Sequence, residues 1–143
     1  MILPDVNVLV YSYRADAPGH AAYRAWLEEA VNAEAPFGIS DLILSGFVRI
    51  VTHSSIFDPP TPLDEALKVP IDLKNLPNCV PIAPGRRHWD IFIRLCRESG
   101  ARGNLVADAF IAALAIESGT ELITSDRDFA RFPGLRWRHP LAG

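Results

Sequence analysis

Three aspartates are the residues of this chain best suited to do chemistry. Asp108 is the one charged residue between Leu105 and Ile116, and Asp5 and Asp126 each end a short run typical of a buried strand. A buried carboxylate is costly, so it is normally paired, protonated or bound to a metal. Oxygen-only ligands suit Mg²⁺ or Mn²⁺, and a carboxylate-bound Mg²⁺ can activate water and stabilise a phosphate in in-line displacement.

Other interpretations of Asp108 are open from the residues alone. The side chain could pair with an arginine, or it could lie at an exposed helix start, where the helix dipole favours a negative charge. What decides between these and a metal site is whether other carboxylates can reach it. Carboxylates that converge repel one another, and one of them would be protonated unless a cation neutralised them.

The elements that must position these acids alternate along the chain. Short runs bounded by turn residues predict strands, and apolar residues at helical spacing predict helices. Pro70 is expected to end or interrupt its helix, and Trp89, Phe92, Ile93 and Cys96 are expected to face inward. The predicted strands are Met1–Asp5, Phe37–Ile39, Cys79–Ile82, Glu121–Asp126 and Leu135–Trp137, and the predicted helices are Asn7–Tyr13, His20–Val31, Asp41–Thr52, Leu63–Leu76, Arg86–Ser99 and Asn104–Ser118.

This alternation predicts an α/β fold, with a parallel sheet and helices on both of its faces. Ligands of such sheets bind outside the carboxyl ends of the strands, where the strand order reverses. Asp5 and Asp126 stand at two such ends, and Asp108, near the start of its helix, could project onto the same edge. We therefore expect three acids from distant parts of the chain to converge, with Asp128 close behind Asp126.

Composition bounds the class of protein. The 143 residues are 49% hydrophobic and 22% charged, which fits one globular domain over residues 1–143. No apolar run reaches the length of a membrane helix, and two cysteines and four scattered histidines match neither a disulfide framework nor a zinc signature. A cytoplasmic location is expected. The net charge of −3 argues against bulk attraction to nucleic acid, although arginine far outnumbers lysine.

Three motifs carry a resemblance to a known family. The opening Asp5-Val-Asn7 looks like the Asp-x-Asn/Ser motif of PIN domains, and the segment 104–113 resembles their central Asp-Ala-x-Ile-Ala-Ala helix. The segment 124–129, Thr-Ser-Asp-Arg-Asp-Phe, is similar to their late Thr-x-Asp-x-Asp-Phe motif. Order, spacing and total length match the VapC toxins of type II toxin–antitoxin systems.

The resemblance implies a PIN-like three-layer α/β/α fold with a mostly parallel sheet of about four or five strands. It also implies an Mg²⁺-dependent endoribonuclease that cuts structured RNA, often tRNA or rRNA, and a cognate VapB-type antitoxin that silences it. Such proteins are commonly homodimers. No membrane partner is expected.

The family roles can be carried over onto matching positions. Asp5 and Asp108 would be the principal metal ligands, and Asp126 would complete the site directly or through a water. Asp128 is a lesser candidate that could equally cap the short helix after it. Asn7 could orient ligands or water, or make a helix-start hydrogen bond. The further candidates for orienting ligands or water are Thr124, Ser125 and Ser45, and those for RNA contact are Arg49, Arg86, Arg87 and Arg102.

One position departs from the family pattern. PIN domains usually carry a glutamate three residues before an arginine on the helix after the second strand. Gly46 occupies that place here, or Ser45 if the register shifts by one. A water held by Ser45, or the side chain of Asp41 from about a helical turn away, could substitute. Loss of a ligand would weaken metal binding or leave one well-formed metal site instead of two.

The chemistry leaves competing functions. The favoured one is the metal-dependent ribonuclease. The alternative is a metal-weakened PIN-like RNA-binding module that blocks its target rather than cutting it. A nuclease acting on DNA flaps ranks last, because the chain is too short to carry an obvious DNA clamp.

Overall fold

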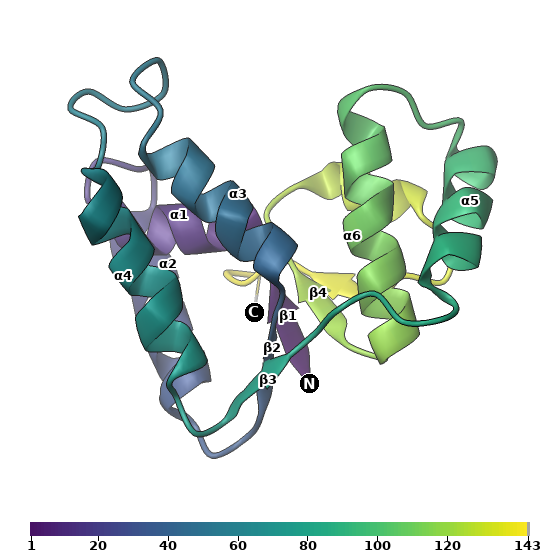
Figure 1. The fold of residues 1–143 in the computed structure, drawn as a ribbon, viewed down its shortest axis with the longest axis horizontal. Coiled ribbons are helices and arrows are strands. Elements are labelled where there is room, and N and C mark those ends of the chain that lie inside the picture. Colours follow the sequence, from purple (N-terminus) through teal and green to yellow (C-terminus); the bar gives the residue numbers. More distant parts are fainter. Residues whose placement is uncertain (143) are drawn as a thin grey trace.

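Five parallel strands form the centre of the molecule. We describe residues 1–142 of a computed structural model, shown in Figure 1. The strand order is β3-β2-β1-β4-β5, and every neighbouring pair is parallel. The strands are β1 (Ile2–Pro4), β2 (Phe37–Ile39), β3 (Cys79–Pro81), β4 (Glu121–Ile123) and β5 (Trp137–Arg138). The parallel α/β architecture predicted from the alternation of elements is confirmed.

Helices cover both faces of the sheet. In Figure 1 the helices α1 to α4 lie together on one side of the strands and α5 and α6 on the other. On the first side α1 packs on α2 and α3, and α3 packs on α4. On the second side α5 packs on α6. The helices are α1 (Val6–Tyr13), α2 (His20–Asn32), α3 (Asp41–Val51), α4 (Leu63–Lys74), α5 (His88–Ser99) and α6 (Asn104–Ser118), with a short 3₁₀ helix η1 (Arg127–Arg131) after β4.

The strand order reverses at β1. The chain runs from β1 outward through β2 to β3, then crosses through α5 and α6 to β4 on the other side of β1. Ile2, Leu3 and Pro4 pair with consecutive residues of β4, whereas the pairing of β1 with β2 is restricted to Ile2 and Phe37. Pro4, which has no backbone N–H to donate, thus lies where the pairing with β2 has stopped. The carboxyl ends of β1 and β4 flank the reversal, which is where open sheets place ligands.

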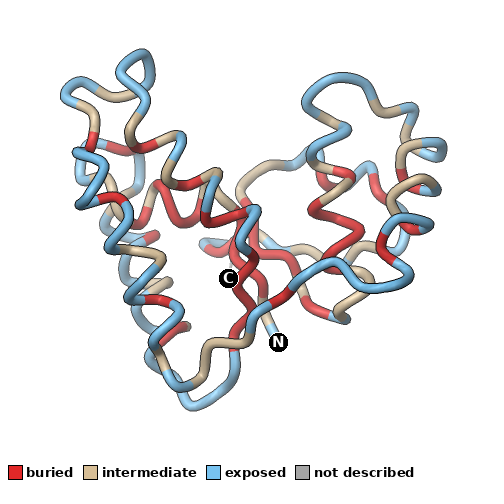
Figure 2. Tube along the Cα trace, in the orientation of Figure 1, coloured by how far each residue is buried: buried red, intermediate tan, exposed pale blue. Residues whose placement is uncertain are grey.

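The core lies between the sheet and the inner faces of α3 and α6, where Figure 2 is red. Leu3, Phe37, Phe47, Leu114 and Leu122 are all fully buried there. Burial of such side chains stabilises the fold by about 1.5–3 kcal/mol each.

Helix α6 is buried over only part of its length. Its buried residues are Ala109 and the run Ile111–Ala115, whereas Val106 and Ala107 in its first turns are exposed. Asp108 lies at the boundary between the two parts and is partly buried. The uniformly apolar sequence predicts burial of the whole helix. Its first turns remain uncovered because they project beyond the carboxyl edge of the sheet.

Two local expectations are wrong. Helix α4 continues through Pro70 to Lys74, because Ala66 and Leu73 anchor it in the core on both sides of the proline. The missing backbone hydrogen bond therefore does not end the helix. Trp89, expected to face inward, is 59% exposed, and the inner face of α5 is formed instead by His88, Ile91 and Leu95.

The start of α5 is held by a side chain from α6. The Glu117 carboxylate accepts hydrogen bonds from the backbone N–H groups of Gly85 at 2.6 Å and Arg87 at 2.9 Å. These contacts hold the pKa of Glu117 below its usual value despite the opposing effect of burial. Because helix N-termini leave N–H groups unpaired, a carboxylate from a neighbouring helix satisfies them well.

No helix within residues 1–142 is long and apolar enough to cross a membrane.

Candidate active site

Asp5 is fixed at the carboxyl end of the central strand. It directly follows β1 and is the N-cap of α1, with one carboxylate oxygen accepting a hydrogen bond from Val6 N at 2.7 Å. Its other oxygen accepts one from the Thr124 hydroxyl at 2.8 Å. The side chain is only 5% exposed. Burial raises the pKa of Asp5, the two hydrogen bonds lower it, and the charge of Asp126 raises it further, with a net rise.

Thr124 connects the acids at the ends of β1 and β4. Its hydroxyl is fully buried and donates to Asp5, while Asp126 N donates to it at 3.1 Å. The Asn7 side chain also reaches this loop, donating to the Thr124 hydroxyl and accepting from Ser125 N, both at 3.4 Å. Of the two interpretations of Asn7, the helix-start hydrogen bond is wrong, since Asp5 caps the helix and Asn7 bonds across to the β4 loop.

Asp108 approaches the same edge from α6. Its pKa is raised to about 6, first by partial burial and then by the charges of Asp126, Asp5 and Asp128. Three carboxylates from other segments are therefore close enough to repel it. None of the seven ion pairs among residues 1–142 involves Asp5, Asp108 or Asp126. Asp108 thus lies within the electrostatic influence of the other acids, and the arginine pairing considered for it does not occur among residues 1–142.

The donor chemistry of this edge suits a hard divalent cation. Carboxylate oxygens that repel one another without a cationic neighbour are the setting that such an ion stabilises. No group of three His, Cys, Asp or Glu side chains in the described part of the chain already forms a metal-binding cluster. Asp5 is held by hydrogen bonds, and Asp108 is the member not tied by one. A cation would therefore be bound by rearrangement of side chains, with Asp108 the most free to move.

Asp128 and Asp41 do not have the capping and replacement roles considered for them from the sequence. Asp126, rather than Asp128, is the N-cap of η1, and its carboxylate accepts from Asp128 N at 2.9 Å. Asp128 is exposed and lies 3.8 Å from Arg131. Asp41 is also exposed and pairs with Lys74 of α4. It is not among the carboxylates that raise the pKa of Asp108, so it is a poor replacement for the missing glutamate.

Gly46 and Ser45 lie on α3, at the position of the missing family glutamate. Both line a groove between α3 and α6, together with Val6 and Ala107, the neighbours of Asp5 and Asp108 in sequence. A β-carbon on Gly46 would lie 3.0 Å from Val6 Cγ2, closer than ordinary van der Waals contact. The glycine therefore permits a close approach of α3 to α1. No sequence pattern predicts this contact, because Val6 looks like any other apolar helix residue.

The arginine candidates separate into two groups. Arg49 lines the groove beside Gly46, and Arg102 is exposed in the loop that leads into α6. Arg86 and Arg87 lie instead beside Glu117, nine residues along α6 from Asp108. At the helical rise of 1.5 Å per residue this is roughly 14 Å along the axis. Arg49 and Arg102 remain candidates for RNA contact near the acids, whereas Arg86 and Arg87 belong to the opposite end of the helix.

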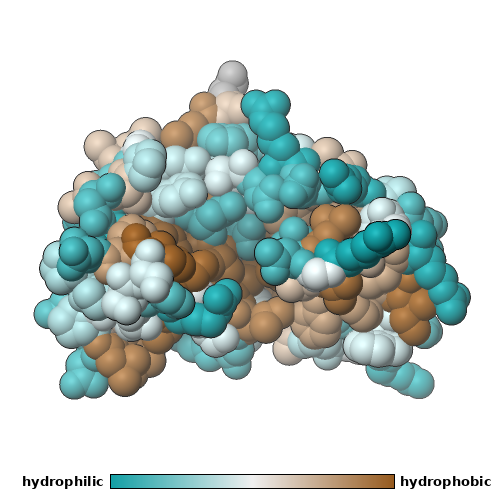
Figure 3. Space-filling view, turned by 90° about the horizontal axis from the view of Figure 1, so that it is seen from above, coloured by the Kyte–Doolittle hydropathy of each residue, from teal (hydrophilic) through white to brown (hydrophobic). Residues whose placement is uncertain are grey.

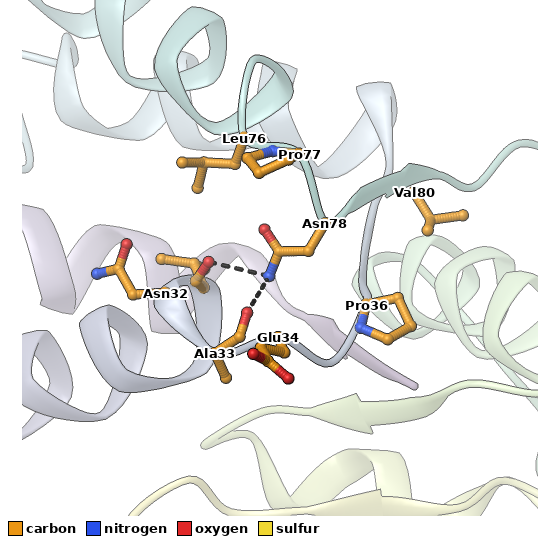
Figure 4. A pocket seen from close by; sticks show the side chains of 9 residues that line it. Asn32, Ala33, Glu34, Pro36, Leu76, Pro77, Asn78 and Val80 are labelled. Carbon is orange, nitrogen blue, oxygen red and sulfur yellow. Dashed lines mark hydrogen bonds between the residues drawn. The ribbon is translucent and has the colours of Figure 1, made fainter.

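A second pocket, of about 590 Å³, lies away from the acids (Figure 4). It is formed where the α2–β2 and α4–β3 loops meet. The side-chain amide of Asn78 points into this junction and donates to the carbonyls of Val31 at 3.0 Å, Ala33 at 2.8 Å and Ala35 at 3.1 Å. These bonds satisfy carbonyl groups at the end of α2. Asn78 is thus explained as a structural link between two loops.

The Thr124 hydroxyl provides a direct test of the acid network. Thr124→Val keeps the shape but removes a donor to Asp5 and an acceptor for Asp126 N. We expect a loss of about 1–2 kcal/mol in the free energy of unfolding. We also expect about a tenfold fall in kcat, because a group displaced from its productive geometry loses catalytic advantage. Chemical denaturation and single-turnover RNA cleavage measure the two effects.

Thr120→Val is the matched control. Thr120 is equally buried, precedes β4 at the opposite end of the strand and bonds to Ser118. It should lose stability but keep the rate of cleavage by the folded protein. Equal rate losses in both variants would show that the Thr124 contact has no special role.

The comparisons with known proteins agree on the family and on the fold. The PIN domain family model matches residues 2–135. Ribonuclease VapC43 of Mycobacterium tuberculosis is 45% identical over 143 residues, covering 100% of this chain and 97% of the relative. Ribonuclease VapC25 of the same organism is 36% identical over 140 residues, covering 98% and 99%. A chain in the crystal structure of VapBC2 from Rickettsia felis, a complex bound to a DNA fragment from its promoter, has the same fold. Its TM-score is 0.68 at 19% identity, over 97% of this chain and 98% of that one.

Proposed function

The chain belongs to the VapC ribonucleases, the PIN-domain toxins of VapBC toxin–antitoxin systems, and from this premise we propose that it is an Mg²⁺-dependent endoribonuclease that cleaves structured RNA, tRNA or rRNA. The observation that supports the proposal is the raised pKa of Asp108, which is due first to burial and then to the charges of Asp126, Asp5 and Asp128. Without a cation these charges repel. Residues 1–143 would act as a single PIN-like domain.

Each acid has a distinct proposed role. Asp5 and Asp108 would hold the metal, Asp126 would complete the site directly or through a water, and Asp128 is a lesser ligand. Mn²⁺ would serve in place of Mg²⁺ because both prefer oxygen ligands. Held by Asp5 and Asp108, an Mg²⁺ ion would supply Lewis-acid chemistry and would lower the pKa of a water molecule near the phosphodiester.

The surrounding residues hold this arrangement. Thr124 and Val6 N fix the Asp5 carboxylate, and Asn7 holds the loop that carries Asp126. Ser45 of α3 lines the groove that also contains Val6 and Ala107, and it would hold a water in place of the family's glutamate. With Gly46 at that position, we expect one well-formed metal site rather than two.

A cognate VapB-type antitoxin is the proposed partner. The support is family membership together with structural similarity to toxin–antitoxin complexes such as VapBC2. We also propose a homodimer, as the family resemblance implies. Co-expression with the product of a small upstream reading frame should restore growth and yield a stable complex.

Mapping of RNA ends tests the function. Sequencing the 5′ ends of cellular RNA after brief induction should reveal new ends in one structured RNA for the wild type and none for Asp108→Asn. New ends in both would assign the cleavage to another nuclease. Growth inhibition and RNA binding that survive Asp108→Asn and chelation, without new ends, would favour the blocking module instead.

Salt dependence tests whether arginines near the acids capture the RNA. With a net charge of −3, affinity must come from a local cationic surface. Two or three phosphate contacts predict about a tenfold fall in kcat/KM between 50 and 200 mM KCl at fixed Mg²⁺. Arg49→Gln should weaken this dependence, and Lys68→Gln on the exposed face of α4 should leave it unchanged. A flat response in the wild type would rule out capture by arginine.

A further inference from the structure

The groove between α3 and α6, called here the α3–α6 groove, adjoins the acids. It has a volume of about 540 Å³, within the range of pockets that hold small planar ligands. Val6, Gly46 and Arg49 line one side of it, and Phe92, Val106 and Phe110 the other. Figure 3 looks onto the molecule from above and shows apolar surface, coloured brown, among hydrophilic side chains on both halves of this face.

The groove is lined by residues next to two of the proposed metal ligands in the sequence, although the acids themselves do not line it. Val6 directly follows Asp5, and Ala107 directly precedes Asp108, so two lining residues are covalent neighbours of two acids. A molecule with a phosphate at the acids would therefore have its neighbouring group close to residues that line the groove.

Gly46 keeps the groove open. A β-carbon at this position would lie 3.0 Å from Val6 Cγ2, so any larger residue would have to displace Val6 or enter the groove. A glutamate at this position would place a charged side chain in the space that Gly46 leaves apolar. The substitution that removes a family carboxylate thus creates a binding surface beside the acids.

The charges around the groove complement a nucleotide. Among the described residues that line it, the polar side chains are those of Arg49 and Ser45, and the others are apolar, aromatic or glycine. A nucleotide presents the matching features, a planar base with an apolar face joined to a phosphate. Aromatic rings and the guanidinium plane bind bases by stacking, and arginine also pairs with phosphate.

We propose that the α3–α6 groove binds the base of one nucleotide that flanks the scissile phosphate of the substrate RNA. The proposal rests on the proposed ribonuclease function and adds a determinant of where the enzyme cuts. With few hydrogen-bonding groups in the groove, recognition depends on stacking and size, so purines and pyrimidines differ more than the members of either class.

The test uses a short RNA that spans the mapped cleavage site and two versions with an abasic nucleotide, one on each side of the scissile phosphate. One abasic version should lower kcat/KM of the wild type about tenfold or more, as expected for loss of one stacked base. Val106→Phe should fill the groove, because Val106 is 37% exposed and has room to grow. This variant should cut intact RNA about tenfold less well and lose its sensitivity to the abasic nucleotide.

A second groove variant and a control variant test whether the effect of Val106→Phe comes from filling the groove. Leu42→Trp narrows the groove from α3, where Leu42 is 46% exposed, and should behave like Val106→Phe. Ile71→Phe adds an aromatic ring to the exposed face of α4 and should behave like the wild type. Thermal melting shows which variants fold.

Three results would overturn the proposal. Equal cleavage of intact and abasic RNA by the wild type would show that no flanking base is bound. Filled-groove variants that cut normally but no longer bind the antitoxin would assign the groove to that partner. Failure of the wild type to cut any RNA would contradict both the proposed function and the base site. This outcome is distinguished from the first one because the intact RNA is then not cleaved either.

Discussion

Asp5→Asn and Asp108→Asn are each expected to lower the rate of RNA cleavage about 1,000-fold or more. The reason is electrostatic. A metal held by carboxylates contributes several kcal/mol to a phosphoryl-transfer transition state, and an amide of the same shape holds it far more weakly. Single-turnover cleavage of a short RNA at saturating Mg²⁺ measures the effect. Asp72→Asn, at an exposed aspartate of α4, is the matched control and should cleave at the wild-type rate.

The two variants should differ in stability, which separates their catalytic and structural effects. Asp108 is destabilised in its charged form by partial burial and by Asp126, Asp5 and Asp128, which raise its pKa to about 6. The folded metal-free protein therefore binds this proton more readily than the unfolded chain. Its stability falls as the pH rises through the interval from about 4 to 6.

At pH 7 Asp108→Asn should then raise the free energy of unfolding of the metal-free protein by about 1 kcal/mol, allowing for solvent screening of a partly exposed group. The gain should vanish below about pH 4, where the wild-type carboxylate is also protonated. Burial also raises the pKa of Asp5, but Asp5→Asn disturbs the hydrogen bonds to Val6 N and Thr124, so its gain should be smaller than that of Asp108→Asn. Chemical denaturation across this pH range measures both. A destabilised Asp108→Asn variant would contradict this account of the acid cluster.

Removal of the metal is the second large effect expected. Chelation should abolish cleavage, and added Mg²⁺ or Mn²⁺ should restore it, while Ca²⁺, which has similar ligands but a looser geometry, should restore little. Because Asp108 must lose its proton to bind a cation, metal binding and cleavage should increase through pH 6.

Proton and metal should also compete. Each tenfold rise in Mg²⁺ below saturation should move the midpoint of the pH–rate profile downward by up to about one pH unit, as for exchange of one proton for one cation. Titrations of rate against pH at several Mg²⁺ concentrations measure this shift. Full activity in excess chelator would end the proposal of a metal-dependent enzyme, whatever the pH profile.

The position of Gly46 changes the meaning of the departure from the family pattern. From the sequence it was a missing carboxylate, to be replaced by Ser45 or Asp41. In the structure Asp41 pairs with Lys74, and Gly46 lies against Val6 at the floor of the α3–α6 groove. Loss of a ligand and gain of an apolar surface thus arise from the same residue.

The sequence by itself determined the elements and the acids at their ends. Alternating strand and helix patterns located β1, β4 and α6, and Asp5 and Asp126 at two strand ends predicted where Asp108 must converge. These features are local, because hydrophobic periodicity and turn residues depend on neighbours a few positions away. These local patterns were also enough to predict a parallel sheet, because two strands joined through a helix are expected to run parallel.

Only the tertiary structure decided which side chains hold the acids. Thr124 bonds to Asp5 from 119 positions away, and Asn7 bonds to the same loop rather than to its own helix. The exposure of Trp89 and the contact of Gly46 with Val6 are likewise set by packing between separate elements. Such contacts have no periodic signal in one sequence, because they depend on how distant segments are brought together by burial of the core.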